Sequence, residues 1–245
     1  MSNDRKAAIV VGVFFIVAAV TSIVALGLYG PILNDPDFVI KGSGNDTQIL
    51  VGALLELILA VTAAGTSITL FPYLKKHNES IALGYVCFRL TEAILIVIGV
   101  ISLLALVTLR QEYAGATASN LAALQTTAKL LVAVHNWTFL LGPAFMLGIN
   151  TMCCSYCLFR TKLVPRAISG LGMTGATLIF SASIFEMFGV FSQISTWGAI
   201  LALPVACYEM SLAGWTITKG FNLATISGLP EDSARRGKKE LIQVS

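Results

Sequence analysis

The sequence predicts an all-α, polytopic membrane protein: a bundle of six transmembrane helices with both termini in the cytoplasm. Of the 245 residues, 56% are hydrophobic and only 12% are charged, whereas ordinary soluble domains have roughly 25% charged residues. The charges gather in short clusters, and uncharged apolar runs lie between them. These runs exceed the roughly 18 residues that distinguish a membrane span from a buried core helix. The positions of the basic residues then require an even number of spans.

Hydropathy places the spans between helix-breaking residues. They are predicted at Ala7–Tyr29, Ile49–Tyr73, Ile81–Leu109, Trp137–Phe159, Ile168–Phe191 and Gly198–Thr218. Gly30 and Pro31 close the first span, Pro72 lies at the end of the second, and Pro165 precedes the fifth. The first run is longer than the roughly 7 to 15 apolar residues of a signal peptide, so we expect it to be retained as a span.

Lysine and arginine predict the orientation, because cytoplasmic loops of membrane proteins retain the positive charge. With six spans, twelve basic residues fall on one side: Arg5, Lys6, Lys75, Lys76, Arg160, Lys162, Arg166, Lys219, Arg235, Arg236, Lys238 and Lys239. The other side receives Lys41, Arg110 and Lys129, together with the acidic residues Asp35, Asp37, Asp46 and Glu112. The side rich in basic residues is therefore predicted to be cytoplasmic, and both termini lie there.

Two regions lie outside the six spans. Residues 119–134 place leucines 121, 124 and 131 on one helical face, with Ser119 or Asn120 as a candidate N-cap. This segment is either an interfacial helix or an early start of the fourth span. Residues 1–222 form the predicted transmembrane domain, and residues 223–245 form a polar, disordered cytoplasmic tail whose basic cluster at residues 235–239 suits anionic headgroups.

Six ionisable side chains fall inside the predicted spans and form the candidate binding cluster: Glu56, Arg89, Glu92, His135, Glu186 and Glu209. A charge at the bilayer centre costs about 2.5 to 3.5 kcal/mol on insertion scales, so such residues normally face the bundle interior. The acids share helix faces with small residues, which allow helices to approach closely. These faces are Gly52, Glu56, Ala60 and Ala64; Gly172, Gly175, Ala182 and Glu186; and Ala202, Ala206, Glu209, Ala213 and Thr216.

Helix geometry predicts how these charges are balanced. Arg89 and Glu92 are three residues apart on the third span and can touch. Arg89 lies about 12 Å from the inner end of its span and Glu209 about 16 Å from the outer end of its own, so the two share a depth. We predict that Arg89 pairs with Glu92, Glu209 or both, and that at least one other glutamate is protonated or meets a cation. Glu56 and Glu186 have no evident basic partner at their depth.

No catalytic, cofactor or metal site is predicted. Cys154 and Cys157 form a C-x-x-C pair, but cysteine is also an ordinary small residue of membrane helices. The two histidines, His77 and His135, are predicted on opposite sides of the bilayer, which excludes a joint haem or zinc site. Gly142 and Pro143 are expected to kink the fourth span. No basic stretch has the interleaved aromatics of a nucleic-acid-binding surface.

Several short stretches, taken in order, resemble one bacterial membrane family, catalogued as domain of unknown function 4386. They are Pro31-Ile-Leu-Asn-Asp-Pro-Asp37, Gly52-Ala-Leu-Leu-Glu-Leu57, Leu74-Lys-Lys-His-Asn-Glu-Ser80, Gly84-Tyr-Val-Cys-Phe-Arg89 with Glu92, His135-Asn-Trp137, Leu163-Val-Pro-Arg166, Glu209, Trp215 and Lys219-Gly-Phe221. The resemblance implies a six-helix protein of the bacterial inner (plasma) membrane. It also implies that Glu56, Arg89, Glu92 and Glu209 occupy recurrent positions. It implies no activity.

Three functions follow from buried charges in a membrane bundle. The first is a transporter or permease that uses the glutamates to bind a small molecule or cation, or to couple to protons. The second is a non-catalytic membrane subunit or signalling partner, in which the ions only specify the bundle. The third is a membrane enzyme acting on lipids, with a glutamate as general acid and His135 or Glu186 as base. Membrane lipids are the expected surroundings, and the oligomeric state stays open.

Overall fold

The computed structural model describes residues 2–33, 46–113 and 121–225, and these residues form helices and short connections without a strand. The helices are α1 (Asn3–Leu33), α2 (Asp46–Leu74), α3 (Glu79–Tyr113), α4 (Leu121–Leu140), the π-helix η2 (Leu141–Met146), α5 (Leu147–Thr161), α6 (Arg166–Met187) and α7 (Thr196–Thr218). Several sequence features fall outside the described residues: Asp35, Asp37, Lys41, Ser119, Asn120 and the basic cluster at 235–239.

The predicted fold class is confirmed, since six helices in the described part of the chain are long and apolar enough to cross a membrane. The fourth of these is the continuous segment Leu121–Thr161, made of α4, η2 and α5. The fourth span thus begins early, and residues 121–134 are not a separate interfacial helix. The fifth span was predicted to reach Phe191, but α6 ends at Met187. Leu223–Thr225 form the short 3-10 helix η3, and Leu223 packs against the core.

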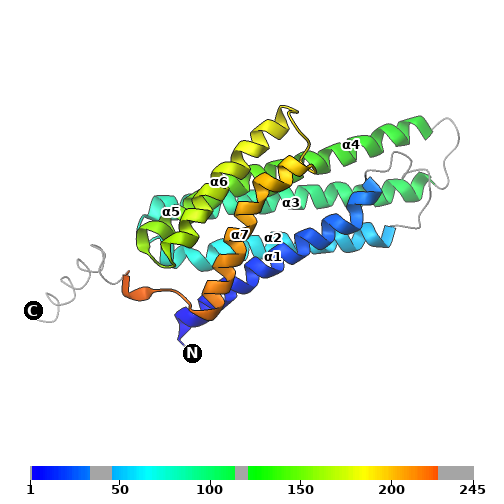
Figure 1. Ribbon diagram of the computed structural model, residues 1–245. Coiled ribbons are helices and arrows are strands. Elements are labelled where there is room, and N and C mark those ends of the chain that lie inside the picture. The colour runs from blue at the N-terminus through cyan, green and yellow to red at the C-terminus, as the bar shows by residue number, and fades with distance from the viewer. Residues whose placement is uncertain (1, 34–45, 114–120, 226–245) are drawn as a thin grey trace, which may run out of the picture.

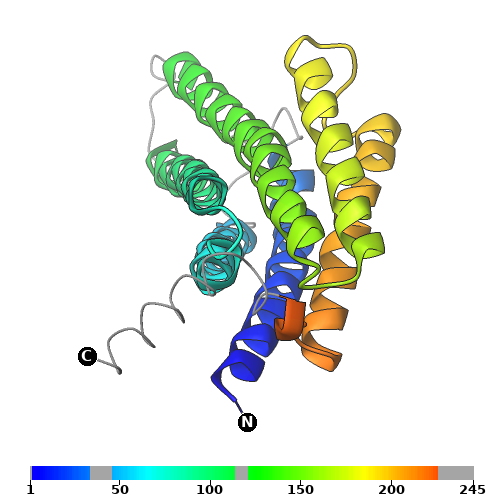
Figure 2. The same ribbon diagram turned by 90° about the vertical axis from the view of Figure 1, so that its left-hand side faces the viewer.

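The helices form a closed ring in which each packs against the next along the chain and α7 returns to α1 (Figures 1 and 2). The start of α1, with Arg5, and the end of α7, followed by Lys219, lie at the same end of this ring, which we call the basic end. There the Arg5 guanidinium donates hydrogen bonds to the Thr216 and Thr218 carbonyl oxygens at 3.1 and 3.2 Å. These contacts satisfy the last carbonyl groups of α7, which have no partner within the helix. The two ends of the bundle domain are thereby joined.

The α6–α7 hairpin is shorter than the rest of the ring. With 22 and 23 residues, α6 and α7 are about 33 and 35 Å long, whereas the 35 residues of α3 extend over about 52 Å. In Figure 1 the hairpin stops short of the far ends of α3 and α4. At the end opposite the basic end, α1 and α4 therefore continue beyond the loop that joins α6 to α7.

The π-helix η2 forms where Pro143 interrupts the fourth span, at the predicted kink. Proline has no N–H, so the carbonyl of Phe139, four residues earlier, loses its helical partner. Gly142 lets this segment approach α3 closely, because a Cβ there would lie 3.2 Å from Leu95 Cβ and 3.3 Å from the Glu92 carbonyl oxygen. The interruption lies between His135 and Asn150, two polar residues of the same span.

The close approach of α6 to α7 depends on Gly175. A Cβ at this position would lie 2.7 Å from the Val205 backbone nitrogen and 2.9 Å from the Pro204 carbonyl carbon. Gly170, on the same helix, has open space around it. We predict that Gly175→Ala destabilises the protein by about 1–3 kcal/mol through overpacking. Thermal unfolding in detergent measures this, and Gly170→Ala is the matched control that should leave the melting temperature unchanged or raise it. Equal effects of the two substitutions would contradict the packing assigned to Gly175.

Candidate functional site

The six ionisable residues of the spans do not form one cluster. Arg89, Glu92 and Glu209 meet in the middle of the bundle, and Glu56 and His135 meet elsewhere. Glu186 joins neither group. It lies in the last turn of α6 and is only half-buried. Its prediction as a buried member of the cluster is wrong, because α6 ends at Met187 and leaves Glu186 at the end of the bundle.

The Arg89 cluster consists of Arg89 and Glu92 on α3, Asn150 on α5 and Glu209 on α7. Arg89 Nη1 lies 2.9 Å from Glu92 Oε2 and donates also to Oε1 at 3.2 Å. Asn150 Nδ2 donates to Glu92 Oε2 at 2.6 Å. Arg89 Nη2 lies 3.8 Å from Glu209 Oε1. The prediction that Arg89 pairs with Glu92, Glu209 or both is confirmed: Glu92 is hydrogen-bonded to the guanidinium, and Glu209 approaches it at the longer distance.

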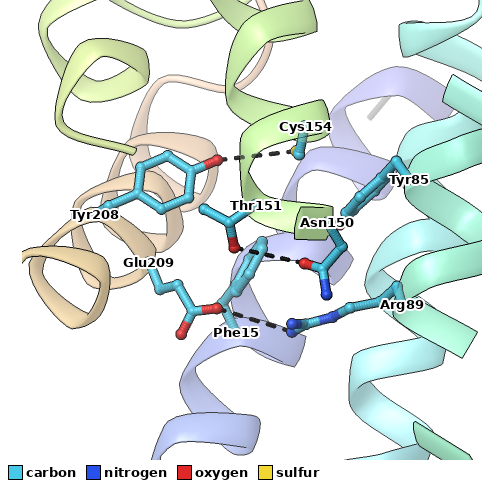
Figure 3. A pocket seen from close by; sticks show the side chains of 8 residues that line it. All are labelled: Phe15, Tyr85, Arg89, Asn150, Thr151, Cys154, Tyr208 and Glu209. Atoms are coloured by element: carbon cyan, nitrogen blue, oxygen red, sulfur yellow. Dashed lines mark hydrogen bonds and ion pairs between the residues drawn. The ribbon is translucent and has the colours of Figure 1, made fainter. Parts of the chain in front are cut away.

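This cluster joins five helices and leaves no internal space for water. Arg89 Nε donates to the Ala63 carbonyl oxygen of α2 at 3.4 Å. The guanidinium also lies 5.9 Å from the ring centroid of Phe15 on α1, a cation–π contact. Figure 3 shows Arg89, Asn150 and Glu209 converging from α3, α5 and α7, and the space between the residues drawn there admits no water molecule. The cluster is thus filled by its own side chains, and its contacts link helices from both ends of the chain.

Glu209 lies at the edge of the cluster. Its side chain is 16% exposed, whereas those of Arg89 and Glu92 are each 4% exposed. The small-residue face predicted for the last span is buried only in part: Ala213 and Thr216 pack against α1, but Ala206 is exposed. The prediction that Ala206 lies on a packed helix face is wrong, because α7 crosses α1 at an angle and the two helices diverge (Figure 1). Glu209 stands at the point where the covered face ends.

The Glu56 cluster consists of Glu56 on α2, Tyr29 on α1 and His135 on α4. The Tyr29 hydroxyl donates to Glu56 Oε1 at 2.6 Å, and His135 Nε2 lies 3.5 Å from the same oxygen. Glu56 therefore has a basic partner, contrary to the prediction. Gly52 makes room for the tyrosine, since a Cβ there would lie 2.7 Å from Tyr29 Cδ1. Glu56 Oε2 and His135 Nδ1 are buried without a hydrogen-bond partner in the described structure.

Beside the Glu56 cluster lies a cavity of about 360 Å³, which we call the His135 cavity. It is lined by Leu26, Tyr29, Gly30 and Leu33 of α1, by His135, Asn136 and Phe139 of α4, and by Ser192, Gln193 and Ile194 of the α6–α7 loop. It lies where the short α6–α7 hairpin ends and α1 and α4 continue. The residues that line this cavity are all different from those that line the filled pocket around Arg89.

A hydrogen bond holds the α6–α7 loop against the cavity. Gln193 Nε2 donates to the Phe139 carbonyl oxygen at 3.3 Å. This is the carbonyl that Pro143 deprives of its helical partner, so the loop amide supplies the donor that proline cannot. Pro143 therefore also leaves the Phe139 carbonyl oxygen free to accept the hydrogen bond that holds the α6–α7 loop, which forms one wall of the cavity.

Three site residues were absent from the sequence prediction. Tyr29 and Gln193 carry no signal in the sequence, because one ends an apolar run and the other lies in a loop. Asn150 does carry one, since an amide inside a span usually bonds to another helix. Among the described residues, no group of three or more His, Cys, Asp or Glu gathers in a way that could hold a metal ion. Cys154 and Cys157 are free thiols in the core.

We predict that Arg89→Leu destabilises the protein more than Glu56→Gln. Loss of the guanidinium leaves Glu92 buried without its ion partner, which costs about 3–5 kcal/mol. Glutamine at position 56 keeps an acceptor oxygen for Tyr29 and removes only a charge. Thermal melts of the two purified variants measure the order, and the reverse order would refute the role assigned to Arg89.

Comparison with known protein families gives a match over most of the chain. The model of the family described as Domain of unknown function (DUF4386) matches residues 10–220. No curated protein matches the chain, and no solved structure matches it. The match begins at Val10 in α1 and extends past the end of α7, and thus includes both ionisable clusters. Because it spans most of the chain, the protein belongs to the DUF4386 family of membrane proteins.

Proposed function

We propose that the protein is a transporter or permease that binds a small organic cation in the His135 cavity and exchanges it for a proton at Glu56. The observation that carries this proposal is the position of the cavity. Two of its lining residues, Tyr29 and His135, both contact the same buried carboxylate oxygen of Glu56. The pocket around Arg89, in contrast, is filled by side chains and has no room for a substrate.

The charge of the Glu56 cluster favours a cationic ligand. Glu56 is 4% exposed and His135 is 3% exposed. Tyr29 donates a hydrogen bond to Oε1 of this buried carboxylate, and in the described part of the chain its Oε2 has no hydrogen-bond partner. An uncompensated buried charge is strongly unfavourable, and a cation in the adjoining cavity would relieve it.

The walls of the cavity favour a cation with apolar substituents. Tyr29, Phe139 and His135 present aromatic rings, and Leu26, Leu33 and Ile194 add aliphatic surface. Aromatic faces attract cations that have lost their water. The volume of about 360 Å³ falls at the lower end of the roughly 300–1,000 Å³ typical of small-ligand sites. A compact organic monocation meets all of these conditions.

Proton coupling follows from competition for one carboxylate. A proton on His135 makes the Glu56–His135 pair neutral overall and removes the attraction for a second cation. One carboxylate cannot neutralise two cations at once, because the two like charges repel at short range. Proton and substrate are thus alternative partners of Glu56, which is the relation that an exchanger requires.

We place the protein in the bacterial inner membrane, with both termini and the basic end in the cytoplasm. The support is the positive-inside bias of twelve basic residues against three. Arg5 contacts the last turn of α7, which Lys219 follows, so the two ends of the bundle lie on one side, as an even number of spans demands. The His135 cavity then lies in the outer half of the membrane, between the ends of α1 and α4.

The transport proposal predicts proton-driven flux of organic monocations in proteoliposomes. Tetraalkylammonium ions of increasing size and tetraphenylphosphonium are the probes, and an imposed pH gradient is the driving force. Glu56→Gln removes the charge, and loss of a charge-assisted contact of about 1.5–3 kcal/mol weakens binding roughly ten- to a hundredfold. Flux at low probe concentration should fall accordingly.

Glu186→Gln is the matched control, because it makes the same change at a half-buried position outside both clusters. Its flux should equal that of the wild type. Flux no greater than in empty liposomes for every probe, or equal loss in the two variants, would refute the proposal.

Reporter fusions test the orientation. A fluorescent protein that folds only in the cytoplasm should be active when fused after Lys76, Lys162 or Lys219, at the basic end. Alkaline phosphatase, which needs the oxidising exterior, should be active only when fused after Tyr113 or Ser192. Activity of the phosphatase at the basic-end positions would invert the topology.

A further inference from the structure

We propose that Glu209 is a protonated carboxylic acid accessible from the lipid hydrocarbon, and hence a modification site for hydrophobic carbodiimides. The proposal concerns the Arg89 cluster and does not depend on the His135 cavity. It combines two observations: the unequal sharing of one guanidinium by two carboxyl groups, and the exposure of only one of them.

Arg89 is shared unequally. Glu92 receives two contacts from the guanidinium, at 2.9 and 3.2 Å, and a third from Asn150 at 2.6 Å. The nearest approach to Glu209 is 3.8 Å, beyond hydrogen-bond distance. One positive charge neutralises one carboxylate, and the geometry assigns that carboxylate to Glu92. The surplus negative charge would fall on Glu209, where a proton removes it.

The other groups around Glu209 do not replace this proton. Apart from Arg89 and Glu92, the titratable side chains of the surrounding pocket are Tyr85 on α3, Cys154 on α5 and Tyr208 on α7, and α1 contributes only Phe15. Tyr208 directs its hydroxyl to Cys154 Sγ at 3.8 Å, away from the carboxyl group (Figure 3). Among the residues lining this pocket, Arg89 is the one cation.

Glu209 is reached from the lipid and Glu92 is not. The Glu209 side chain is 16% exposed against 4% for Glu92. Its helical neighbours Ala206 and Met210 are exposed on the surface of the bundle. Glu209 lies nine residues, about 14 Å, from the end of α7 at Thr218. A hydrocarbon layer about 30 Å thick therefore surrounds it, and water does not.

A carbodiimide reports both properties at once. The acid proton moves to one nitrogen of the N=C=N group, and the carboxylate oxygen bonds to the central carbon, which forms an O-acylisourea. Migration of the acyl group to the second nitrogen then gives a stable N-acylurea. No atom is lost and no further reactant is needed. An ionised carboxylate lacks the proton for the first step, and a hydrophilic carbodiimide does not enter the hydrocarbon.

The experiment treats the purified full-length protein in lipid vesicles with dicyclohexylcarbodiimide and locates the adduct by mass spectrometry of proteolytic fragments. The expected result is an adduct on Glu209 and none on Glu92, with yield that falls as the pH rises. A water-soluble carbodiimide should give no adduct at Glu209. Glu209→Gln should abolish the modification, with the thermal melt as a check of folding.

Glu92→Gln provides the decisive variant, because it leaves Glu209 itself untouched. After removal of the Glu92 charge, Glu209 is the carboxyl group of this cluster that can pair with the Arg89 guanidinium. Glu209 then ionises, so the yield of its carbodiimide adduct should fall severalfold. The infrared carbonyl band of protonated carboxyl groups should lose intensity in the same variant. No adduct at Glu209 in the wild type, equal modification of Glu92, or an unchanged yield in Glu92→Gln would each overturn the proposal.

Discussion

One guanidinium group, that of Arg89, must stay charged in the middle of an apolar bundle, and the packing of the central helices depends on how this is achieved. Glu92 lies 2.9 Å away on the same helix, Asn150 holds that carboxylate from α5, and Glu209 approaches from α7. The Ala63 carbonyl adds a contact from α2. Glu92 shares α3 with Arg89, but the other groups belong to α2, α5 and α7, so the full set of contacts forms only when these helices are together.

The same physical problem is solved differently at Glu56. There the carboxylate has a tyrosine and a histidine beside it, and one oxygen of the acid and one nitrogen of His135 have no partner in the described structure. A cavity adjoins this incomplete arrangement, whereas the Arg89 cluster is filled by its own side chains. A site that binds and releases a ligand needs unsatisfied groups and space, and a site that holds helices together needs neither.

The rise per residue of an α-helix was sufficient to predict a contact that depends only on how deep each residue lies in the membrane. Counting about 1.5 Å per residue placed Arg89 and Glu209 at one level, and the structure brings them within 3.8 Å. It was insufficient where a contact depends on which helices are neighbours. The Glu56–His135 pair crosses from α2 to α4, and nothing along the chain states that these faces meet. Glu186 was misplaced because its helix ends one turn earlier than hydropathy indicates.

The sequence by itself determined the number of spans, the bias of basic residues and the presence of buried charge, because hydrocarbon selects residues by polarity and a span by its length. The tertiary structure alone decided which charged groups are packed among other side chains and which lie beside a cavity. That choice depends on the lengths and crossing angles of the helices: α6 and α7 are too short to cover α1 and α4, and α7 diverges from α1 beyond Ala213. Such differences arise from packing between distant segments, which a linear pattern of polarity does not encode.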